Sequence, residues 1–285
     1  MSLPILAYVF IFSYRPLKNL VMAFQDYRPG KKVQEWVGWE NFGLLFNDER
    51  FLRVIRNTIC MSTLNLVFSF LFAILLAILL NELRNGIYKK VVQSISYLPH
   101  FLSWIIVTGL VANFLTSDNG MINNALTQFG ILKEPVPWLS EPNLFWLVVA
   151  AANVWKETGW NSIIYLAAIT NISSELYEAA FMDGANRFQR IRHITLPGIK
   201  STVVILLILN LGFILNAGFE VQFLLGNGIV SDVSETIDIF VLKNGISLGN
   251  FSLATAAGMF QTVVSVIMIT GANYVAKKLG EERLV

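Results

Sequence analysis

The sequence predicts an all-α membrane protein in which six transmembrane helices form a single domain over residues 1–285. Two features of the chain predict this fold class. Hydrophobic residues make up 55% of it and charged residues only 14%, whereas about 25% of the residues in soluble domains are charged. The charged residues also lie between long uncharged runs, and about 20 apolar residues suffice for a helix that crosses a bilayer. Lipid is therefore the expected solvent for most side chains.

Five of the six spans are clear from the length of their apolar runs. They cover residues 55–82, 91–115, 143–170, 199–224 and 251–277. The run at 91–115 contains Pro99 and His100, and we expect a kink there because proline removes a backbone donor and crowds the preceding turn. The run at 143–170 is interrupted in its middle by Lys156 and Glu157.

The first span, at 2–24, has a shorter apolar part, which ends where Arg15, Pro16 and Lys18 follow. A signal peptide has a similar length, but a small-residue cleavage site is absent and no globular domain follows. We therefore interpret residues 2–24 as a transmembrane helix, and native residues missing upstream would explain its shortness.

The distribution of Lys and Arg predicts the orientation. The loop at 83–90, the loop at 171–200 and the tail with Lys277, Lys278 and Arg283 are basic, whereas segments 116–142 and 226–250 each carry one basic residue. Cytoplasmic loops are enriched in Lys and Arg, so both termini are expected in the cytoplasm. The outer segment 25–54 departs from this rule, since it carries several basic residues.

Several functional classes are disfavoured by the composition. The single cysteine, Cys60, allows no disulfide within the chain, and His100 and His193 lack partners at metal-site spacing, so no metal site is expected. A phosphate-binding G-x-x-x-x-G-K-[ST] loop is absent, and the chain is therefore not expected to bind ATP itself. A net charge of only +2, without a dense basic patch, disfavours nucleic acid as a partner.

The loop at 171–198 carries the most specific pattern in the sequence. Glu178-Ala179-Ala180 is followed after three residues by Gly184, and after nine more by an Ile-x-Leu-Pro run that ends at Pro197. Physically, this is a short helix, a break and a second helix, because glycine permits a turn that bulkier residues do not. Small alanines would let another protein approach the first helix closely. Ser173 or Ser174 can cap that helix, and Asp183 can pair with Arg187 if the helix continues across the break.

This pattern resembles, at every position, the EAA motif of the permeases of binding-protein-dependent ABC importers, and the resemblance covers nearly the whole chain. Segments 155–165, 218–225 and 235–241 look like those of permeases for complex oligosaccharides, such as those released from pectin or alginate. The resemblance implies a MetI-like type I importer bundle in which the loop is a coupling helix that docks on a cytoplasmic ATPase. The residues it places at that contact are Glu178, Ala179, Ala180, Asp183, Gly184 and Arg187.

The resemblance also implies partners. They are a second, homologous permease subunit (which makes this chain the MalF-like half), two ABC ATPase subunits that bind ATP and Mg, and an extracytoplasmic solute-binding protein that delivers an oligosaccharide. The chain itself is expected to hold no cofactor, to catalyse no bond chemistry and to lie in the lipid bilayer of a bacterial cytoplasmic (inner) membrane. Unlike the maltose member, it has no large extra periplasmic domain.

Polar residues inside the predicted spans are candidates for the substrate pathway, because such groups are costly in lipid and usually face a bundle interior or a wet cavity. The alternative is that they hold helices together by hydrogen bonds. A rough alignment with the maltose permease supports part of the set, and Lys156 together with the resemblance suggests an anionic, uronate-containing cargo. The candidates are Lys156, Thr158, Gly159, Asn161, Asn216, Gly218, Glu220 and Gln222.

Two other classes remain as alternatives. A proton-coupled secondary transporter would use Glu220 or His100 as a proton relay and would work without an ATPase, but the inverted repeat typical of such proteins is not visible. A membrane-embedded enzyme would need a nucleophile and base, or a metal site, at one depth, and no such constellation stands out.

Overall fold

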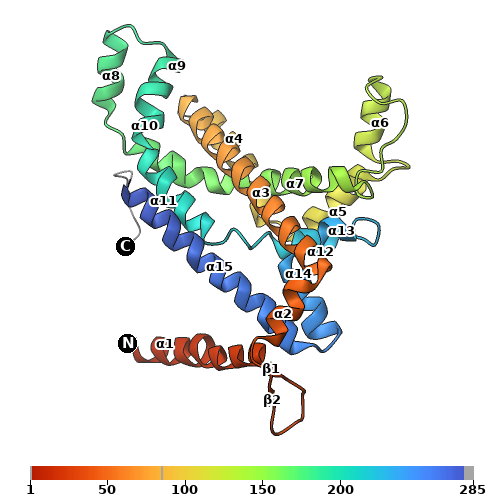
Figure 1. Ribbon diagram of the computed structural model, residues 1–285. Coiled ribbons are helices and arrows are strands. Elements are labelled where there is room, and N and C mark those ends of the chain that lie inside the picture. The colour runs from red at the N-terminus through yellow and green to blue at the C-terminus, as the bar shows by residue number, and fades with distance from the viewer. Residues whose placement is uncertain (1, 85, 279–285) are drawn as a thin grey trace.

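The computed structural model describes residues 2–84 and 86–278, which are mostly helical (Figure 1). The basic tail residue Arg283 lies outside the described residues. Helices α8 (Ser174–Met182) and α9 (Arg187–Arg190) stand at one end of the molecule, and the small antiparallel pair β1 (Gln25–Asp26) and β2 (Glu35–Trp36) stands at the other. The predicted loop and the predicted outer segment therefore lie at opposite ends.

Two described helices are long and apolar enough to cross a membrane by length and composition. These are α3 (Glu49–Glu82) and α15 (Phe251–Lys278), and the number rises to four if each of two bent helix pairs is one span. The six expected spans are not all reached by this criterion. Residues 2–24 are helical throughout, but the type of helix changes twice. The α-helix α1 (Ser2–Val9) is followed by the π-helix η1 (Phe10–Tyr14) and then by the 3₁₀-helix η2 (Arg15–Phe24). Helix α7 (Pro142–Thr170) is 29 residues long, but polar side chains interrupt its apolar run.

The first bent pair confirms the kink expected at Pro99. Helix α4 (Ile87–Tyr97) continues through the turn η3 (Leu98–Phe101), and α5 (Trp104–Leu115) then departs at an angle of 102°. Pro99 lies within η3, and Ser103 caps α5 by accepting a hydrogen bond from the amide of Ile106 at 3.4 Å. The bend is much sharper than a proline kink alone, because two residues between the helices leave helical geometry altogether.

The second bent pair lies at the end of the predicted loop. Residues Arg187–Gly198, which comprise α9, η4 (Ile191–Thr195) and α10 (Leu196–Gly198), meet α11 (Lys200–Leu211) at 55°. Gly198 lies close to Ile172 there, since a Cβ atom on this glycine would lie 2.4 Å from the Cδ1 atom of Ile172, and that side chain would have to move. Ile172 thus packs directly against the bend and joins the two ends of the loop.

The continuous helix expected at 199–224 is interrupted, and this part of the prediction needs correction. α11 ends at Leu211, and α12 (Phe219–Leu225) begins only after a non-helical stretch that contains two glycines. Gly218 takes a φ of +85°, a conformation that other residues rarely adopt. The chain then forms α13 (Ser231–Ser234), α14 (Ile237–Leu242) and η5 (Lys243–Ser247) before α15.

Helix α3 is the spine of the molecule. Three clusters of buried apolar side chains lie along it, and each cluster contains an α3 residue: Val54, Met61 or Ala73. The first cluster joins α3 to α2 (Glu40–Asn47), α14 and α15, the second to α7 and α12, and the third to α7 and the loop at 171–198. Helix α3 therefore connects the two ends of the molecule that Figure 1 shows.

Candidate functional site

The loop at 171–198 begins with a helical hairpin formed by α8 and α9. Ser173 caps α8, because its hydroxyl accepts a hydrogen bond at 3.3 Å from the amide two residues on. α8 ends at Met182, and Gly184 takes a φ of +77°, which turns the chain back. Asn186 and Gln189 then form a reciprocal capping box at the start of α9. Local sequence therefore defines the whole hairpin.

Large apolar side chains on this hairpin are exposed. Met182 is 83% exposed, and Leu176, Phe181 and Phe188 are also exposed. Contiguous apolar surface outside a core commonly marks an interaction site. Since the hairpin projects at one end of the molecule (Figure 1) and these side chains are exposed, they are accessible to another protein. The sequence motif pointed to the neighbouring residues, but it did not single out these four.

The six residues predicted at the ATPase contact all lie on or beside the hairpin. Ala180 is half-buried and the other five are exposed. The expected pairing of Asp183 with Arg187 does not form, because α8 ends before Gly184 and the helical spacing of the pair is lost. Arg187 instead lies 3.9 Å from Glu82 at the end of α3. The hairpin thus contacts the spine helix directly.

A polar network joins α7 to the bend between α4 and α5. Lys156 is buried, and its Nζ donates to the carbonyl of His100 at 2.6 Å. Glu157 lies 2.8 Å from His100 Nδ1 and 3.4 Å from Lys156 Nζ. The imidazole of His100 also stacks on Trp160, with ring centres 4.5 Å apart. Sequence reasoning considered these residues separately, and it had no signal that would join positions 57 residues apart.

Gly159 lies where α7 crosses α4. A Cβ atom at this position would lie 1.9 Å from the backbone oxygen of Ser96, so the two helices can approach this closely only because Gly159 has no side chain. Its neighbour Thr158 has a buried hydroxyl for which the described residues provide no hydrogen-bond partner. The structure thus gives Gly159 a packing role, whether or not cargo passes nearby.

Asn161 lies two residues after Gly159 on α7, beside a small polar hollow. Its amide donates to the hydroxyl of Ser69 on α3 at 3.1 Å. The hollow, of about 70 Å³, is also lined by Tyr165 and Asn210. Amide and hydroxyl groups of this kind can hydrogen-bond the hydroxyls of a sugar. The hollow thus brings the pathway candidate Asn161 close to Asn210 of α11.

The remaining four pathway candidates lie around the break between α11 and α12. Asn216 and Glu220 are exposed, Gly218 provides the turn, and Gln222 is fully buried. The amide of Gln222 donates to the carbonyl of Ala217, which also accepts a hydrogen bond from Asn65 on α3.

Asn161 of the first group and the break that carries the second group are therefore bonded to the same face of α3. The amide of Asn65 donates to the carbonyl of Ala217 in the break between α11 and α12. The hydroxyl of Ser69, four residues later, accepts a hydrogen bond from Asn161 on α7. Residues four apart lie on the same face of a helix, one turn along its axis. Neither Asn65 nor Ser69 was predicted, because each is a common polar residue inside an apolar run.

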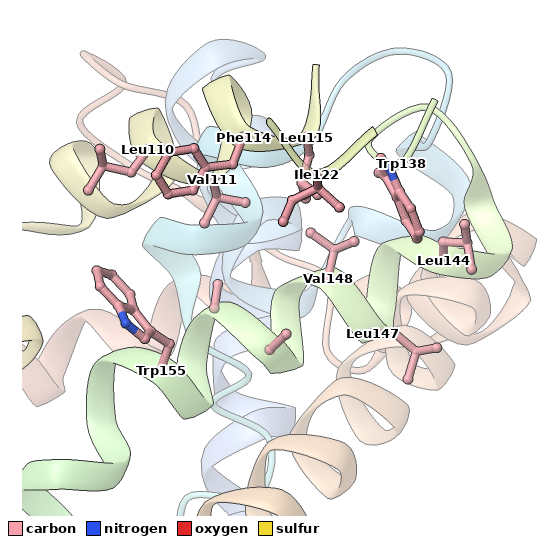
Figure 2. Close-up of a pocket in the computed structure, with 12 residues that line it drawn as sticks. Leu110, Val111, Phe114, Leu115, Ile122, Trp138, Leu144, Leu147, Val148 and Trp155 are labelled. Atoms are coloured by element: carbon pink, nitrogen blue, oxygen red, sulfur yellow. The ribbon is translucent and has the colours of Figure 1, made fainter. Parts of the chain in front are cut away.

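A groove on another side of α7 has a different chemical character. It has a volume of about 540 Å³ and lies between α5, α6 (Met121–Gln128) and α7. Figure 2 shows Leu110, Val111 and Phe114 of α5 facing it, with Trp155 and Trp138 at its two ends. Apolar side chains line it almost throughout, so a sugar there would leave most of its hydroxyls without partners. The polar candidates and this groove thus divide α7 into two faces.

Comparison with known proteins identifies the family. Residues 69–281 match the family described as "Binding-protein-dependent transport system inner membrane component". The chain belongs to this family. The match covers the spine helix from its middle, the helical hairpin and all of α15. Members are membrane permease components of ABC transporters rather than catalytic subunits.

Relatives extend the similarity over nearly the whole permease. It is 45% identical over 284 residues to the polygalacturonan/rhamnogalacturonan transport system permease protein YteP of Bacillus subtilis (strain 168), which covers 99% of the permease and 88% of YteP. Protein LplB of the same organism is 43% identical to the permease over 284 residues, and the match covers 99% of the permease and 89% of LplB.

A solved transporter has the same fold. One chain of a bacterial ABC transporter "involved in the import of the acidic polysaccharide alginate" superimposes with a TM-score of 0.90 at 41% identity, covering 98% of the permease and 94% of that chain. A second structure shows a bacterial alginate ABC transporter in complex with an alginate pentasaccharide-bound periplasmic protein. One of its chains superimposes with a TM-score of 0.90 at 40% identity, and the match covers 98% of the permease and 93% of that chain. The permease is therefore an inner membrane component of a binding-protein-dependent ABC transport system, with a MetI-like helical fold.

Proposed function

We propose that this permease moves uronate-containing oligosaccharides into the cytoplasm by ATP-driven alternating access. The observation that carries the mechanism is the hairpin of α8 and α9, which presents exposed apolar side chains at one end of the molecule. An ATPase that covered them would bury apolar area and obtain a rigid contact with the permease. ATP and Mg would then be bound by the ATPase subunits and not by this chain.

Contacts within the chain support transmission from that hairpin. Tyr177 on α8 hydrogen-bonds Thr195 at 3.0 Å, and Ile172 packs on Gly198 at the bend into α11. Arg187 lies beside Glu82 at the end of α3. A displacement of the hairpin would thus act on both α11 and α3. Coupling of this kind needs an element with two arrangements, and the partners at both ends bias its equilibrium.

The cargo assignment rests on the relatives. The alginate transporter handles an acidic polysaccharide, and YteP belongs to a polygalacturonan/rhamnogalacturonan system. Similarity to both over nearly the whole chain supports an acidic oligosaccharide as cargo here. The polar face of α7 and the break before α12 are the proposed pathway, with Asn161 and Gln222 as hydrogen-bonding groups. Lys156 is held by His100 and Glu157, so on this proposal it fixes the bend rather than contacting cargo in the arrangement described.

The proposed assembly has two permeases, two ATPase subunits and an extracytoplasmic binding protein in a bacterial cytoplasmic membrane. The hairpin end faces the cytoplasm, together with both termini, and segments 116–142 and 226–250 face outward. The basic residues of the loop at 171–198 support this orientation. The solved complex of the alginate transporter with a periplasmic protein supports the binding protein as a partner.

Purification of the tagged permease from its native membrane, followed by identification of its companions, tests the assembly. We expect a second permease and a P-loop ATPase. Replacing Met182 by Asp should shed at least about 90% of the ATPase, because a charge would be buried in the contact. Met121→Asp is the matched control, since Met121 is also exposed but lies on α6, on the proposed outer side.

Uptake into proteoliposomes tests the activity. Trigalacturonate should enter with the binding protein outside and ATP at the hairpin side, and a nonhydrolysable ATP analogue should not support uptake. A permease that purifies alone and imports trigalacturonate on a proton gradient without an ATPase would overturn the proposal in favour of a secondary transporter. Equal loss of ATPase in both methionine variants would show that the hairpin is not the contact.

A further inference from the structure

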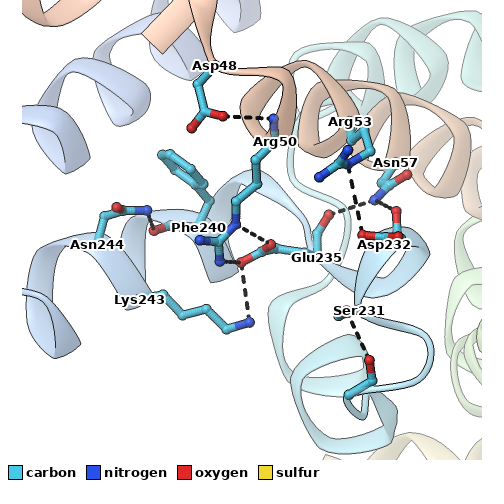
Figure 3. Close-up of polar contacts among 11 residues, drawn as sticks. Asp48, Arg50, Arg53, Asn57, Ser231, Asp232, Glu235, Phe240, Lys243 and Asn244 are labelled. Atoms are coloured by element: carbon cyan, nitrogen blue, oxygen red, sulfur yellow. Dashed lines mark hydrogen bonds and ion pairs between the residues drawn. The ribbon is translucent and has the colours of Figure 1, made fainter. Parts of the chain in front are cut away.

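A polar hollow lies between the start of α3 and the segment that runs from α12 to η5. It has two parts, of about 290 and 210 Å³, which share Ser231, Glu235 and Lys243. Figure 3 shows Arg50, Arg53 and Asn57 reaching into it from α3. Under the proposed orientation the hollow faces outward, well separated from the α8–α9 hairpin. None of its side chains belongs to the pathway candidates except Gln222.

Arg50 binds the carboxylate of Glu235 through two hydrogen bonds. Its Nε and an Nη atom donate to the two carboxylate oxygens at 3.0 and 2.7 Å, a bidentate geometry that fixes both groups. Burial would raise the pKa of Glu235, but the hydrogen bonds from Arg50 and the charge of Lys243 outweigh it and lower that pKa below its ordinary value. Asn57 fixes the same segment by donating to the carbonyls of Asp232 and Glu235. This part of the hollow is a rigid frame.

Arg53 and Lys243 are bound less tightly. Arg53 lies 3.9 Å from Asp232, whose side chain is 80% exposed and therefore well solvated. Lys243 lies 3.3 Å from Glu235, which Arg50 already neutralises. The described lining residues thus carry three cations against two carboxylates, and the surplus positive charge is shared by Arg53 and Lys243. An anionic group from outside the chain would therefore be attracted to Arg53 and Lys243.

The smaller part of the hollow also has an unsatisfied acceptor. Gln222 lines it and is 0% exposed. Its amide nitrogen donates to Ala217, but its Oε1 atom has no hydrogen-bond partner among the described residues. A buried acceptor without a partner is unusual, because it loses its bond to water without replacement. A hydroxyl group that entered this part of the hollow would supply the missing hydrogen bond.

We propose that this hollow is an outer binding site for an acidic sugar, with Arg53 and Lys243 binding its carboxylate and Gln222 accepting a hydrogen bond from a ring hydroxyl. This inference rests on the proposed function and adds a specific recognition site to it. A cation pair, a buried amide and a rigid frame suit a uronate better than a neutral sugar, which would leave the surplus charge uncompensated. The site would select acidic cargo as it leaves the binding protein.

The test measures direct binding to the purified transporter without its binding protein. The probes are labelled trigalacturonate and its trimethyl ester, which has the same rings and no charge. We expect trigalacturonate to bind the unaltered complex more tightly than the ester. In the double variant Arg53→Gln/Lys243→Gln its Kd should rise about tenfold or more, as the loss of charge-assisted hydrogen bonds implies. The Kd of the ester should not change.

Arg28→Gln is the charge-matched control, because Arg28 is an exposed cation on the outer β-hairpin and pairs locally with Asp26. It should leave both Kd values unchanged. Gln222→Leu, which keeps the volume but removes both the acceptor and the hydrogen bond to Ala217, should weaken both probes alike by a smaller factor. Affinity for the cargo-free binding protein is measured for every variant, so that a loss of protein docking is recognised.

Three results would overturn the site. They are no binding of trigalacturonate to the unaltered complex, an equal loss for acid and ester in the double variant, and weaker binding-protein docking with an unchanged Kd for trigalacturonate. The last result would assign the cations to the protein partner. Uptake with the binding protein present tests the proposed function separately, so uptake that persists while direct binding is absent would refute this site alone.

Discussion

At the scale of the residue, Gly159 illustrates how one missing side chain positions two helices. Its polar surroundings suggest a pathway residue from the sequence, whereas the structure places it against the backbone of Ser96. Backbone cannot move aside as the end of a flexible side chain can. The same position would therefore be sensitive to substitution for a reason unrelated to cargo.

Gly159→Ala should destabilise the permease by about 1–3 kcal/mol, the usual effect of overpacking a tight contact. The added Cβ would force α4 and α7 apart. Thermal unfolding of the purified complex measures this, with Gly109→Ala on α5 as the control, since a Cβ atom at Gly109 meets nothing within 4 Å. Similar unfolding temperatures for the two variants would contradict the packing role.

At the scale of the element, the α8–α9 hairpin is specified by its own caps and by one turn. Ser173 begins it, Gly184 reverses it and Asn186 restarts the helix. Each device acts within a few residues, so the hairpin keeps its shape although much of its apolar surface is exposed. Preorganisation of this kind reduces the ordering that a partner must impose on binding.

Gly184→Ala should weaken the hairpin by about 1–2 kcal/mol, because a residue with a Cβ is strained at a φ of +77°. Less ATPase should then co-purify with the permease. Gly184→Asn should retain more of it, because asparagine tolerates the left-handed region better than alanine does. Equal recovery of the ATPase with the two variants would show that this backbone conformation does not determine the contact.

At the scale of the whole molecule, the pair of Arg50 and Glu235 joins segments 185 residues apart. It fixes the start of α3 to the segment before α15, at the end opposite the hairpin. α3 extends from this pair past Asn65 and Ser69 to Glu82 beside Arg187. The proposed outer site and the proposed ATPase contact are thus linked by one continuous helix.

The pH dependence of stability tests this pair. Because the pKa of Glu235 is lowered in the fold, its contribution is fully present above the ordinary value of 4.5 and is lost only as the pH falls through the lower folded pKa. Unfolding temperatures should therefore show no loss from this group between pH 8 and pH 5.

Arg50→Gln should reduce stability by about 1–2 kcal/mol at neutral pH, less than for a fully buried pair because the Arg50 side chain is 42% exposed. Without the hydrogen bonds and charge of Arg50, burial raises the pKa of Glu235 relative to the unaltered protein. The loss of stability on acidification should therefore begin at a higher pH. Arg28→Gln serves as the control and should follow the unaltered protein. An identical pH profile for Arg50→Gln and the unaltered protein would contradict the assigned role.

The sequence by itself determined the class of the protein and its most specific element. Low charge and long apolar runs indicated membrane helices, and the spacing around Glu178 and Gly184 indicated the family. The cap at Ser173 and the kink at Pro99 followed from local chemistry. Such features depend on residues close together in the chain, so their physical causes are visible in a single sequence.

Only the tertiary structure decided how distant polar residues combine. The contacts of Lys156 and His100, the hydrogen bond from Asn161 to Ser69 and the hollow beside Glu235 all join different helices. The break after Leu211 also required the structure, because glycine and asparagine inside an apolar run are compatible with either a helix or a turn. An apolar run specifies that a helix can form in lipid, but packing against its neighbours determines where it bends and which polar groups meet.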